Sequence, residues 1–435
     1  MTERDDDALR DARDAAERFD FRRARRDLAR WFDANARSFP WRDAPSPYRV
    51  LVSEFMLQQT TTQTVERYFP RFLERFPTAR ALADASDSDV LKLWEGLGYY
   101  RRARMLRDAA RTIVEKYDGR APEELQALEA LPGVGRYVAG AVRSFGFDKR
   151  APILEANTRR LHARLLALRA EISSAAALNV LWAFADAWLP RERAGRPEGA
   201  YRRLNAALMD LGRLVCAPNA PKCDECPLAS LCRAKRLELQ SVVPVEKPRR
   251  ATIPRQDVAF WIRRADLPTA RVPSDSTRET RDDDVLLVRR PDDALWAGMW
   301  DFPRFERLDA RVGDAQRRDP ALRDRLKMFL EDEVRVDARD VAPGVAVATL
   351  KHAVTHFRIE LTLRKLAFDD DELDRAGERA LFDLEPRDSD ATRRDFPRKI
   401  AQELRWVGVD ALKDQPLSST GRKLATIVAE RSAQN

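Results

Sequence analysis

The chain has 435 residues, 44% of them hydrophobic, which predicts two or three domains with ordinary cores. The first twenty residues are mostly charged residues and alanine, and no apolar run reaches membrane-spanning length, so we expect a cytoplasmic protein without signal peptide or membrane segment. Lys and Arg number 79 against 71 Asp and Glu, and this net charge of +8 suits a polyanionic partner, although most charges belong on solvated helix faces.

The order of patterns along the chain predicts two folded parts. Residues 1–20 form a charged N-terminal extension. Apolar residues then recur at helical spacing between Pro, Gly, Asp and Ser breaks, so we expect an all-helical region over residues 21–235. Residues 236–251 are rich in Pro, Lys and Arg and predict a linker.

Beyond the linker the period changes from helical to alternating. Phe357, Ile359, Leu361 and Leu363 share one face of an expected strand. We therefore expect a smaller α+β domain over residues 252–431.

One acid interrupts an apolar run early in the helical region. Glu54 lies among residues 50–57, which otherwise have the character of a helix core. In an arbitrary protein such a residue is an edge residue or has a satisfying partner. A second acid, Glu155, has similar surroundings at the expected start of another helix. Two carboxylates in apolar settings are candidates for chemistry.

Two glycines predict a close approach of the backbone to an anion. Gly133 and Gly135 follow Leu131-Pro132 and precede an expected helix. Glycine allows a tight turn, and the N-H groups of a helix N-terminus can bind phosphate. An ordinary turn between two helices is the alternative, but the full string is typical of a helix-hairpin-helix that binds DNA phosphate without reading sequence.

All four cysteines lie within one short stretch, which predicts a shared metal centre. A disulfide is unexpected in a cytoplasmic chain. Zinc and a [4Fe-4S] cluster both accept four thiolates, and the spacing alone leaves both open. The four residues are Cys216, Cys223, Cys226 and Cys232.

Together these motifs resemble the MutY family of adenine DNA glycosylases, within the endonuclease III superfamily. The resemblance covers nearly the whole chain, with the more specific motifs in the first 235 residues. It is carried by residues 40–42, 53–60, 94–100, 131–137 and 153–157, by the cysteine spacing, and more weakly by residues 285–291 and 295–303.

The resemblance implies a helix-hairpin-helix glycosylase region whose cysteines hold a [4Fe-4S] cluster. It implies a monomeric, nucleoid-associated enzyme of base excision repair. The substrate would be double-stranded DNA containing adenine opposite 8-oxoguanine or guanine.

The resemblance also assigns roles to the two acids and their neighbours. Glu54 would protonate adenine N7, with an apolar wall that raises its pKa, and Glu155 would stay ionised beneath the positively charged sugar. Tyr137 would hydrogen-bond the second carboxylate, and Asn157 would orient that carboxylate and a water. Because lyases of the superfamily have a lysine where Tyr137 stands, we expect a monofunctional glycosylase.

Base flipping leaves a gap in the duplex that protein must fill. The resemblance implies that Gln59 and Tyr99 wedge beside the orphaned base, with Gln58 flanking them. In an isolated motif these would be surface polar and core aromatic residues. Trp41 and Arg42 resemble part of the adenine pocket.

Two positions depart from the family pattern. Glu155 stands where most members have aspartate, which lengthens the acid's arm by one methylene. Ala206 stands where the family has Gln or Glu against the adenine edge, so adenine selection must use other groups, such as water or Arg42.

Residues 252–431 resemble the Nudix-like domain that the family uses to recognise 8-oxoguanine. Residues 329–334 lack the Glu-rich box of a true Nudix hydrolase, so we expect recognition without hydrolysis. Thr355 and His356 occupy the place of the lesion-reading loop, with Val354 in place of an aromatic residue. The alternative for His356 is a surface histidine at a strand start.

Two other functions remain open at this stage. One is a lesion-binding protein with weakened catalysis, motivated by Glu155 and Ala206. The other is an endonuclease III-type glycosylase and lyase, which Tyr137 and the C-terminal domain argue against.

Overall fold

The computed structural model describes residues 3–192, 197–248, 251–268, 281–291, 294–307, 320–368, 401 and 403–434. The chain folds into two compact units. The first comprises Met1–Ala85 and Arg102–Arg249, and the second comprises Ser86–Arg101 and Arg250–Asn435. The sequence did not indicate that residues 86–101 pack with the later part of the chain.

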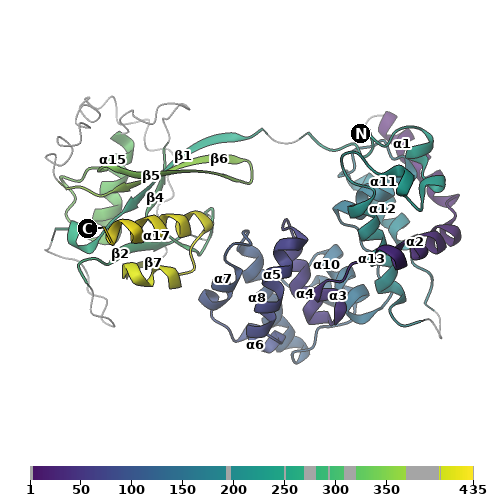
Figure 1. The fold of residues 1–435 in the computed structure, drawn as a ribbon, viewed down its shortest axis with the longest axis horizontal. Helices are drawn as coiled ribbons and strands as arrows, with labels where there is room; N and C mark the ends of the chain where they lie inside the picture. Colours follow the sequence, from purple (N-terminus) through teal and green to yellow (C-terminus); the bar gives the residue numbers. More distant parts are fainter. Residues whose placement is uncertain are drawn as a thin grey trace. The chain divides into compact units, whose positions relative to one another are not determined.

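Helices build the first unit, as predicted (Figure 1). Its helices are α1 (Glu3–Glu17), α2 (Phe21–Asn35), α3 (Pro40–Asp43), α4 (Pro47–Leu57), α5 (Thr62–Arg75), α6 (Ala79–Ala83), α8 (Arg101–Tyr117), α9 (Leu125–Glu129), α10 (Arg136–Ala141), η1 (Val142–Gly146), α11 (Ala156–Leu166), α12 (Ala175–Trp188), α13 (Ala200–Leu214), η2 (Cys223–Glu225), η3 (Ala229–Leu231) and α14 (Arg233–Arg236).

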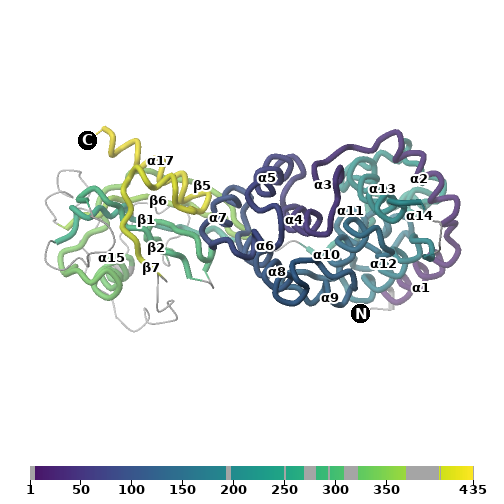
Figure 2. Tube along the Cα trace, turned by 90° about the horizontal axis from the view of Figure 1, so that it is seen from below, coloured from purple at the N-terminus to yellow at the C-terminus, as the bar shows by residue number. Residues whose placement is uncertain are grey.

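The N-terminal extension is part of a helical core. Helix α1 packs on α11 and α12, and Leu9 and Ala12 are buried there. Asp11 Oδ1 lies 2.7 Å from Nη2 of Arg233 in α14. Figure 2 shows α1 and α2 alongside α12 and α13. The charged residues of this segment therefore face solvent while its small apolar stripe joins the core.

Helix α4 is buried on nearly every side, which its sequence explains. Ser46 caps it by accepting a hydrogen bond from the Arg49 amide, and Pro47 starts its first turn. Residues 50–56 are all buried, and α5, α10 and η1 pack around them. A helix without a polar face needs such an enclosure.

The second unit has the expected mixed composition of strands and helices. Its elements are α7 (Asp87–Trp94), β1 (Ile253–Trp261), η4 (Arg264–Asp266), β2 (Val285–Arg289), β3 (Trp300–Asp301), β4 (Arg304–Glu306), α15 (Pro320–Met328), η5 (Phe329–Val334), β5 (Ala346–Val354), β6 (Phe357–Lys365), β7 (Glu403–Val407), η8 (Val409–Asp414) and α17 (Ser419–Ser432).

Two small sheets form the centre of this unit. One has the order β4-β1-β6-β5, with β1 and β6 parallel, and the other has the antiparallel order β3-β2-β7. Alternate residues of β1 enter two cores: Val258 and Phe260 pack with α15 and η5, while Ala259 and Trp261 pack with α17. A strand buried on both faces has a continuous apolar run, which hides the alternation.

Helix α7 is fastened within the second unit by ion pairs. Arg422 of α17 donates to both carboxylate oxygens of Glu95, at 2.6 and 2.9 Å. Lys92 and Asp414 form a more exposed pair at 3.1 Å. The bidentate, partly buried pair is the stronger of the two because it is less screened by water.

Among the described residues, no helix combines the length and the apolar character needed to cross a membrane.

A buried histidine in α11 makes the stability of the first unit depend on pH. The His162 ring lies 5.2 Å from the Phe184 ring and 6.3 Å from that of Trp188, and neither of its nitrogens has a hydrogen-bond partner. Burial lowers the pKa of His162 to about 3. The folded protein thus holds this ring neutral at pH values where the unfolded chain protonates it.

We predict that His162→Phe removes part of the protein's acid sensitivity. Because the folded pKa lies below the unfolded value, stability is lost as the pH falls below about 6.5, amounting to about 2 kcal/mol at pH 5. Urea unfolding at pH 7.5 and 5 measures the loss in the parent and the variant. An equal loss of unfolding free energy between pH 7.5 and 5 in the parent and the variant would show that His162 does not contribute to the acid sensitivity.

Candidate active site

A cavity in the first unit gathers residues from several helices. It measures about 910 Å³. Its lining includes residues of α2, α3, α4, α5, α10, η1, α11 and α13. The predicted site residues that line it are Trp41, Arg42, Glu54, Gln58, Gln59, Tyr137, Glu155 and Asn157, together with Ala206.

Glu54 reaches this cavity from the most buried helix of the unit. Its exposed fraction is 5%. The pKa of Glu54 is raised to about 7, chiefly by burial. The hydrogen bond from Tyr137 lowers it, the negative charge of Glu155 raises it and the positive charge of Arg42 lowers it, and the value is the net result. The carboxyl group can therefore keep a proton near neutral pH.

Tyr137 contacts a different acid from the one we expected. Its hydroxyl donates to Oε2 of Glu54 at 2.7 Å, and the expected hydrogen bond to Glu155 is wrong. The reason is packing: α10, which begins one residue before Tyr137, lies against α4, while the Glu155 carboxylate turns back to its own helix. Burial, followed by the charge of Glu54, raises the pKa of Tyr137 well above its usual value, so the phenol stays protonated.

Glu155 is the N-cap of α11. Its carboxylate accepts from the backbone amides of Asn157 at 2.8 Å and Thr158 at 2.9 Å, and Thr158 Oγ1 accepts from the Glu155 amide. The side chain folds over the helix end and closes a capping box with Thr158. Burial raises the pKa of Glu155 despite these hydrogen bonds, a direction that opposes our expectation of a firmly held charge.

Asn157 connects the cap to the interior of the unit. Its Nδ2 donates to Glu155 Oε2 at 3.2 Å, and its Oδ1 accepts from Arg160 Nη2 at 2.9 Å. Arg160 also donates to the carbonyls of Cys216 and Gly212, at 2.8 and 2.6 Å. The amide side chain is thus held on both sides.

An acid that we did not single out from the sequence holds Arg42. Asp210 in α13 is buried and accepts from Arg42 Nη1 at 2.7 Å and Nη2 at 3.1 Å. Ala206 precedes Asp210 by one helical turn and also lines the cavity. The sequence signal that could have identified Asp210 is its position as a lone acid on the apolar stripe of α13.

Trp41 is buried and stacked on Phe39, with ring centroids 5.0 Å apart.

The expected wedge residues lie on two turns with positive φ. Gln59 follows α4, is exposed and has φ 56°, while Gln58 is half-buried at the helix end. Tyr99 is 46% exposed with φ 49°, but it belongs to the second unit. Non-glycine residues rarely adopt this backbone region, so both turns need support from their surroundings.

The glycine turn joins α9 and α10 as expected. Gly133 has φ 73°, and an added Cβ would lie 2.8 Å from the Met105 Cβ and 3.0 Å from the Phe55 ring. Gly135 precedes α10 in an extended conformation with open space around it. Glycine is therefore required sterically at 133, and Gly135 leaves backbone accessible.

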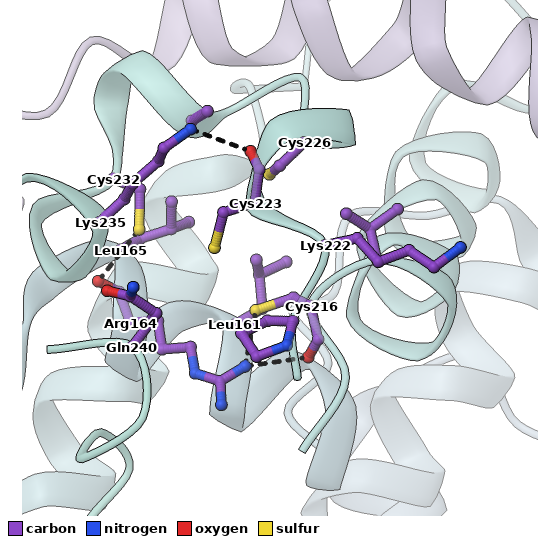
Figure 3. Close-up of a pocket in the computed structure, with 13 residues that line it drawn as sticks. Leu161, Arg164, Leu165, Cys216, Lys222, Cys223, Cys226, Cys232, Lys235 and Gln240 are labelled. Atoms are coloured by element: carbon purple, nitrogen blue, oxygen red, sulfur yellow. Dashed lines mark hydrogen bonds between the residues drawn. The ribbon is translucent and has the colours of Figure 1, made fainter. Parts of the chain in front are cut away.

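The four cysteines line a second, smaller pocket of the first unit (Figure 3). Cys216 follows α13, Cys223 begins η2, Cys226 ends it as its C-cap, and Cys232 lies between η3 and α14; all are free thiols. Burial raises the pKa of Cys226 to about 12. Arg164 donates to Cys216 Sγ at 3.4 Å and to the Ala217 carbonyl at 2.7 Å. Among the described residues, no three His, Cys, Asp or Glu side chains are placed to hold one metal ion.

Thr355 and His356 form the turn between β5 and β6 in the second unit. Thr355 is exposed, has φ 54° and donates to the Val354 carbonyl at 2.7 Å. The His356 ring lies 4.1 Å from the Phe357 ring. The histidine thus lies directly before β6, against the ring of Phe357, which sequence analysis had placed in a strand without linking it to His356.

We predict that Glu155 contributes to stability through its cap. Glu155→Ala removes both acceptors for the α11 amides and should lower the free energy of unfolding by about 1 kcal/mol. Glu155→Asp keeps a good capping side chain and is the matched control. Urea unfolding of the three proteins tests this, and an unchanged midpoint in the alanine variant would contradict it.

Comparisons with known proteins agree on both parts of the chain. Residues 52–184 match the model of the HhH-GPD superfamily base excision DNA repair protein, and residues 278–426 match that of the NUDIX domain. A solved structure of a thermostable thymine-DNA glycosylase is 27% identical, with a TM-score of 0.44 over 50% of this chain and 97% of that one.

Among curated relatives, the adenine DNA glycosylase of Rattus norvegicus is 34% identical over 64% of this chain and 60% of its own length. That of Buchnera aphidicola is 33% identical over 64% of this chain and 74% of its own length. The chain spans about 60% of the mammalian relatives it matches. From this shared sequence, and from the combination of a helix-hairpin-helix glycosylase region with a Nudix-like region, we conclude that the chain belongs to the adenine DNA glycosylase family.

Proposed function

We propose that this protein is a monofunctional adenine DNA glycosylase that removes adenine opposite 8-oxoguanine or guanine in double-stranded DNA. One observation carries the proposal: a buried carboxyl group with a pKa of about 7, Glu54, faces a cavity that a second carboxylate also lines. The relatives' name, adenine DNA glycosylase, supports the choice of base.

The cavity suits a nucleotide turned out of the duplex. Its volume of about 910 Å³ falls within the usual range for small-molecule pockets. The Trp41 ring and the small side chain of Ala206 offer apolar contacts to a purine. Arg42, fixed by Asp210, offers N-H donors to ring nitrogens. Since alanine at 206 has no hydrogen-bonding group, this guanidinium is a candidate for reading the base.

Glu54 protonates the leaving base. The neutral carboxyl group donates its proton to adenine N7, and the electron pair of the breaking C1′–N9 bond passes to the purine. The oxygen of a water molecule then bonds to C1′, and a proton from that water returns to Glu54. Tyr137 holds the carboxyl group throughout by its 2.7 Å hydrogen bond.

Positive charge that develops on the sugar needs a nearby anion. Glu155 supplies it if its carboxylate remains ionised, and the two α11 amides and Asn157 stabilise that form. Neither a lysine nor a cysteine lines the cavity among the described residues. Without such a nucleophile no Schiff base forms, so hydrolysis leaves an uncut abasic strand.

The second unit would recognise the lesion without hydrolysing nucleotides. The Thr355–His356 turn presents a hydroxyl and an imidazole at the tip of the β5–β6 hairpin. Residues 329–334 form η5 and carry no Glu-rich metal-binding box. The Thr355 hydroxyl and the His356 ring can donate to the 8-oxo oxygen of an oxidised guanine or accept from its N7–H.

We also propose that the cysteine pocket holds a [4Fe-4S] cluster. Zinc needs its ligands within about 2.3 Å of one point, whereas a cubane binds four thiolates spread around a larger centre. The four thiols line one pocket, and the resemblance to the adenine DNA glycosylase family favours the cluster over zinc. Arg164 and Lys235, which also line the pocket, would offset the thiolate charge. The cluster would organise this loop and supply no step of base removal.

A lesion-binding protein with weakened catalysis is the second candidate. It is favoured by the Glu155 carboxylate, whose oxygens are engaged by the α11 cap. A capped carboxylate is less free to approach the sugar, so catalysis would slow while binding persisted.

An excision assay on a duplex containing adenine opposite 8-oxoguanine tests the function. With enzyme in excess we expect strand breaks only after alkali. Tight binding without an abasic product would favour the second candidate, and breaks without alkali would show lyase activity. Glu54→Gln should reduce base release by at least a thousandfold with duplex affinity nearly unchanged.

The pH dependence provides a further check on Glu54. Because its proton is the reagent, the rate of release should fall as the pH rises above about 7. A flat profile between pH 6 and 9, or parental activity in the glutamine variant, would remove Glu54 from the mechanism.

Metal analysis tests the cluster. The purified protein should be brown and contain about four iron per chain. Chelation or Cys226→Ser should remove the colour and destabilise the loop after α13. Stoichiometric zinc in place of iron would contradict the proposal.

A further inference from the structure

The turn after α4 is bound by a buried arginine from another helix. Arg102, in the first turn of α8, has an exposed fraction of 7%. Its Nη1 donates to the carbonyls of Phe55 at 2.9 Å and Met56 at 3.0 Å, and also to that of Gln58. Its Nη2 donates to Thr60 Oγ1 at 3.2 Å.

These acceptors are the groups that a helix end leaves without partners. The last carbonyls of α4 have no intrahelical donor, and they carry the negative end of the helix dipole. A cation that donates to two of these carbonyls, and to the Gln58 carbonyl that follows them, supplies the missing donors and places positive charge at the negative end of the dipole. A buried charge is costly unless it is bound in this way, which explains why the guanidinium lies here.

The same contacts fix a turn with an unusual backbone. Gln59 has φ 56°, and it lies between Gln58 and Thr60, which Arg102 holds at a carbonyl and a hydroxyl. A hydrogen bond of 3.3 Å from the Thr60 amide to the Leu57 carbonyl closes the turn. Left-handed backbone costs about 1 kcal/mol or more for a non-glycine residue, so it persists only under such restraint.

We infer that Arg102 is a positioning residue that holds the Gln58–Thr60 turn in the shape with which Gln59 enters the duplex. The inference rests on the proposed function. A wedge that is rigid before it meets DNA loses less entropy when it fills the gap left by the flipped base. In the sequence, Arg102 lies three residues after Tyr99, the other expected wedge.

Hydrogen exchange in the free protein tests the restraint without any activity. In Arg102→Ala the amides of residues 58–60 should exchange at least tenfold faster than in the parent, and Arg102→Lys should be intermediate because an ammonium group cannot span four acceptors. The matched control is Arg111→Ala: Arg111 belongs to the same helix and binds the Ala83 carbonyl at the end of α6. It should leave residues 58–60 unchanged.

Single-turnover excision then tests the link to flipping. With adenine opposite 8-oxoguanine, Arg102→Ala should be slower than the parent by at least tenfold. With adenine opposite an abasic site, where no pairing must be broken, the defect should shrink to within about threefold. Equal defects on both duplexes would show a general loss of the active site and overturn the inference.

The two experiments separate the inference from the function. Unchanged exchange at residues 58–60 in Arg102→Ala overturns the inference even if the parent releases adenine. A parent that releases no adenine overturns the proposed function, and Arg102 then has no wedge to position, whatever the exchange result.

Discussion

The arrangement of the first unit depends on one costly feature, the burial of the Glu54 carboxyl group on a helix without a polar face. Residues 50–56 of α4 are all buried, so the acid has little contact with water and its pKa is raised to about 7. The surroundings limit this cost: Tyr137 donates a hydrogen bond and Arg42 contributes positive charge. Asp210 holds Arg42 by a bidentate pair.

Helix α11 connects the cavity with the cysteine pocket. Its N-terminus bears Glu155, and its next turns bear Arg160 and Arg164, whose guanidinium groups bind backbone carbonyls around Cys216. Arg160 also donates to the side-chain oxygen of Asn157, whose amide nitrogen in turn donates to Glu155. The Glu155 carboxylate is therefore positioned by the same helix that supports the cysteine loop. A displacement of that loop would reach Glu155 through α11.

Glu155 occupies the N-cap of α11, a position where aspartate is also favoured. Its side chain folds back so that the carboxylate accepts from the amides of Asn157 and Thr158. Its carboxylate is then shared between capping the helix and facing the cavity. The balance between these two contacts determines how closely the acid approaches a sugar, because any movement toward the cavity breaks hydrogen bonds of the cap.

Sequence patterns by themselves determined the helical character of the first part, the mixed character of the second and the residues that meet at the cavity. Periodicity and motif spacing are local properties, and Glu54, Tyr137 and Glu155 were visible as local anomalies or motif members. Only the tertiary structure decided which acid Tyr137 contacts, that Asp210 binds Arg42, that Arg102 caps α4, and that residues 86–101 pack in the second unit. Each of these joins residues far apart in sequence, and such pairings depend on how helices pack rather than on the period of any one helix.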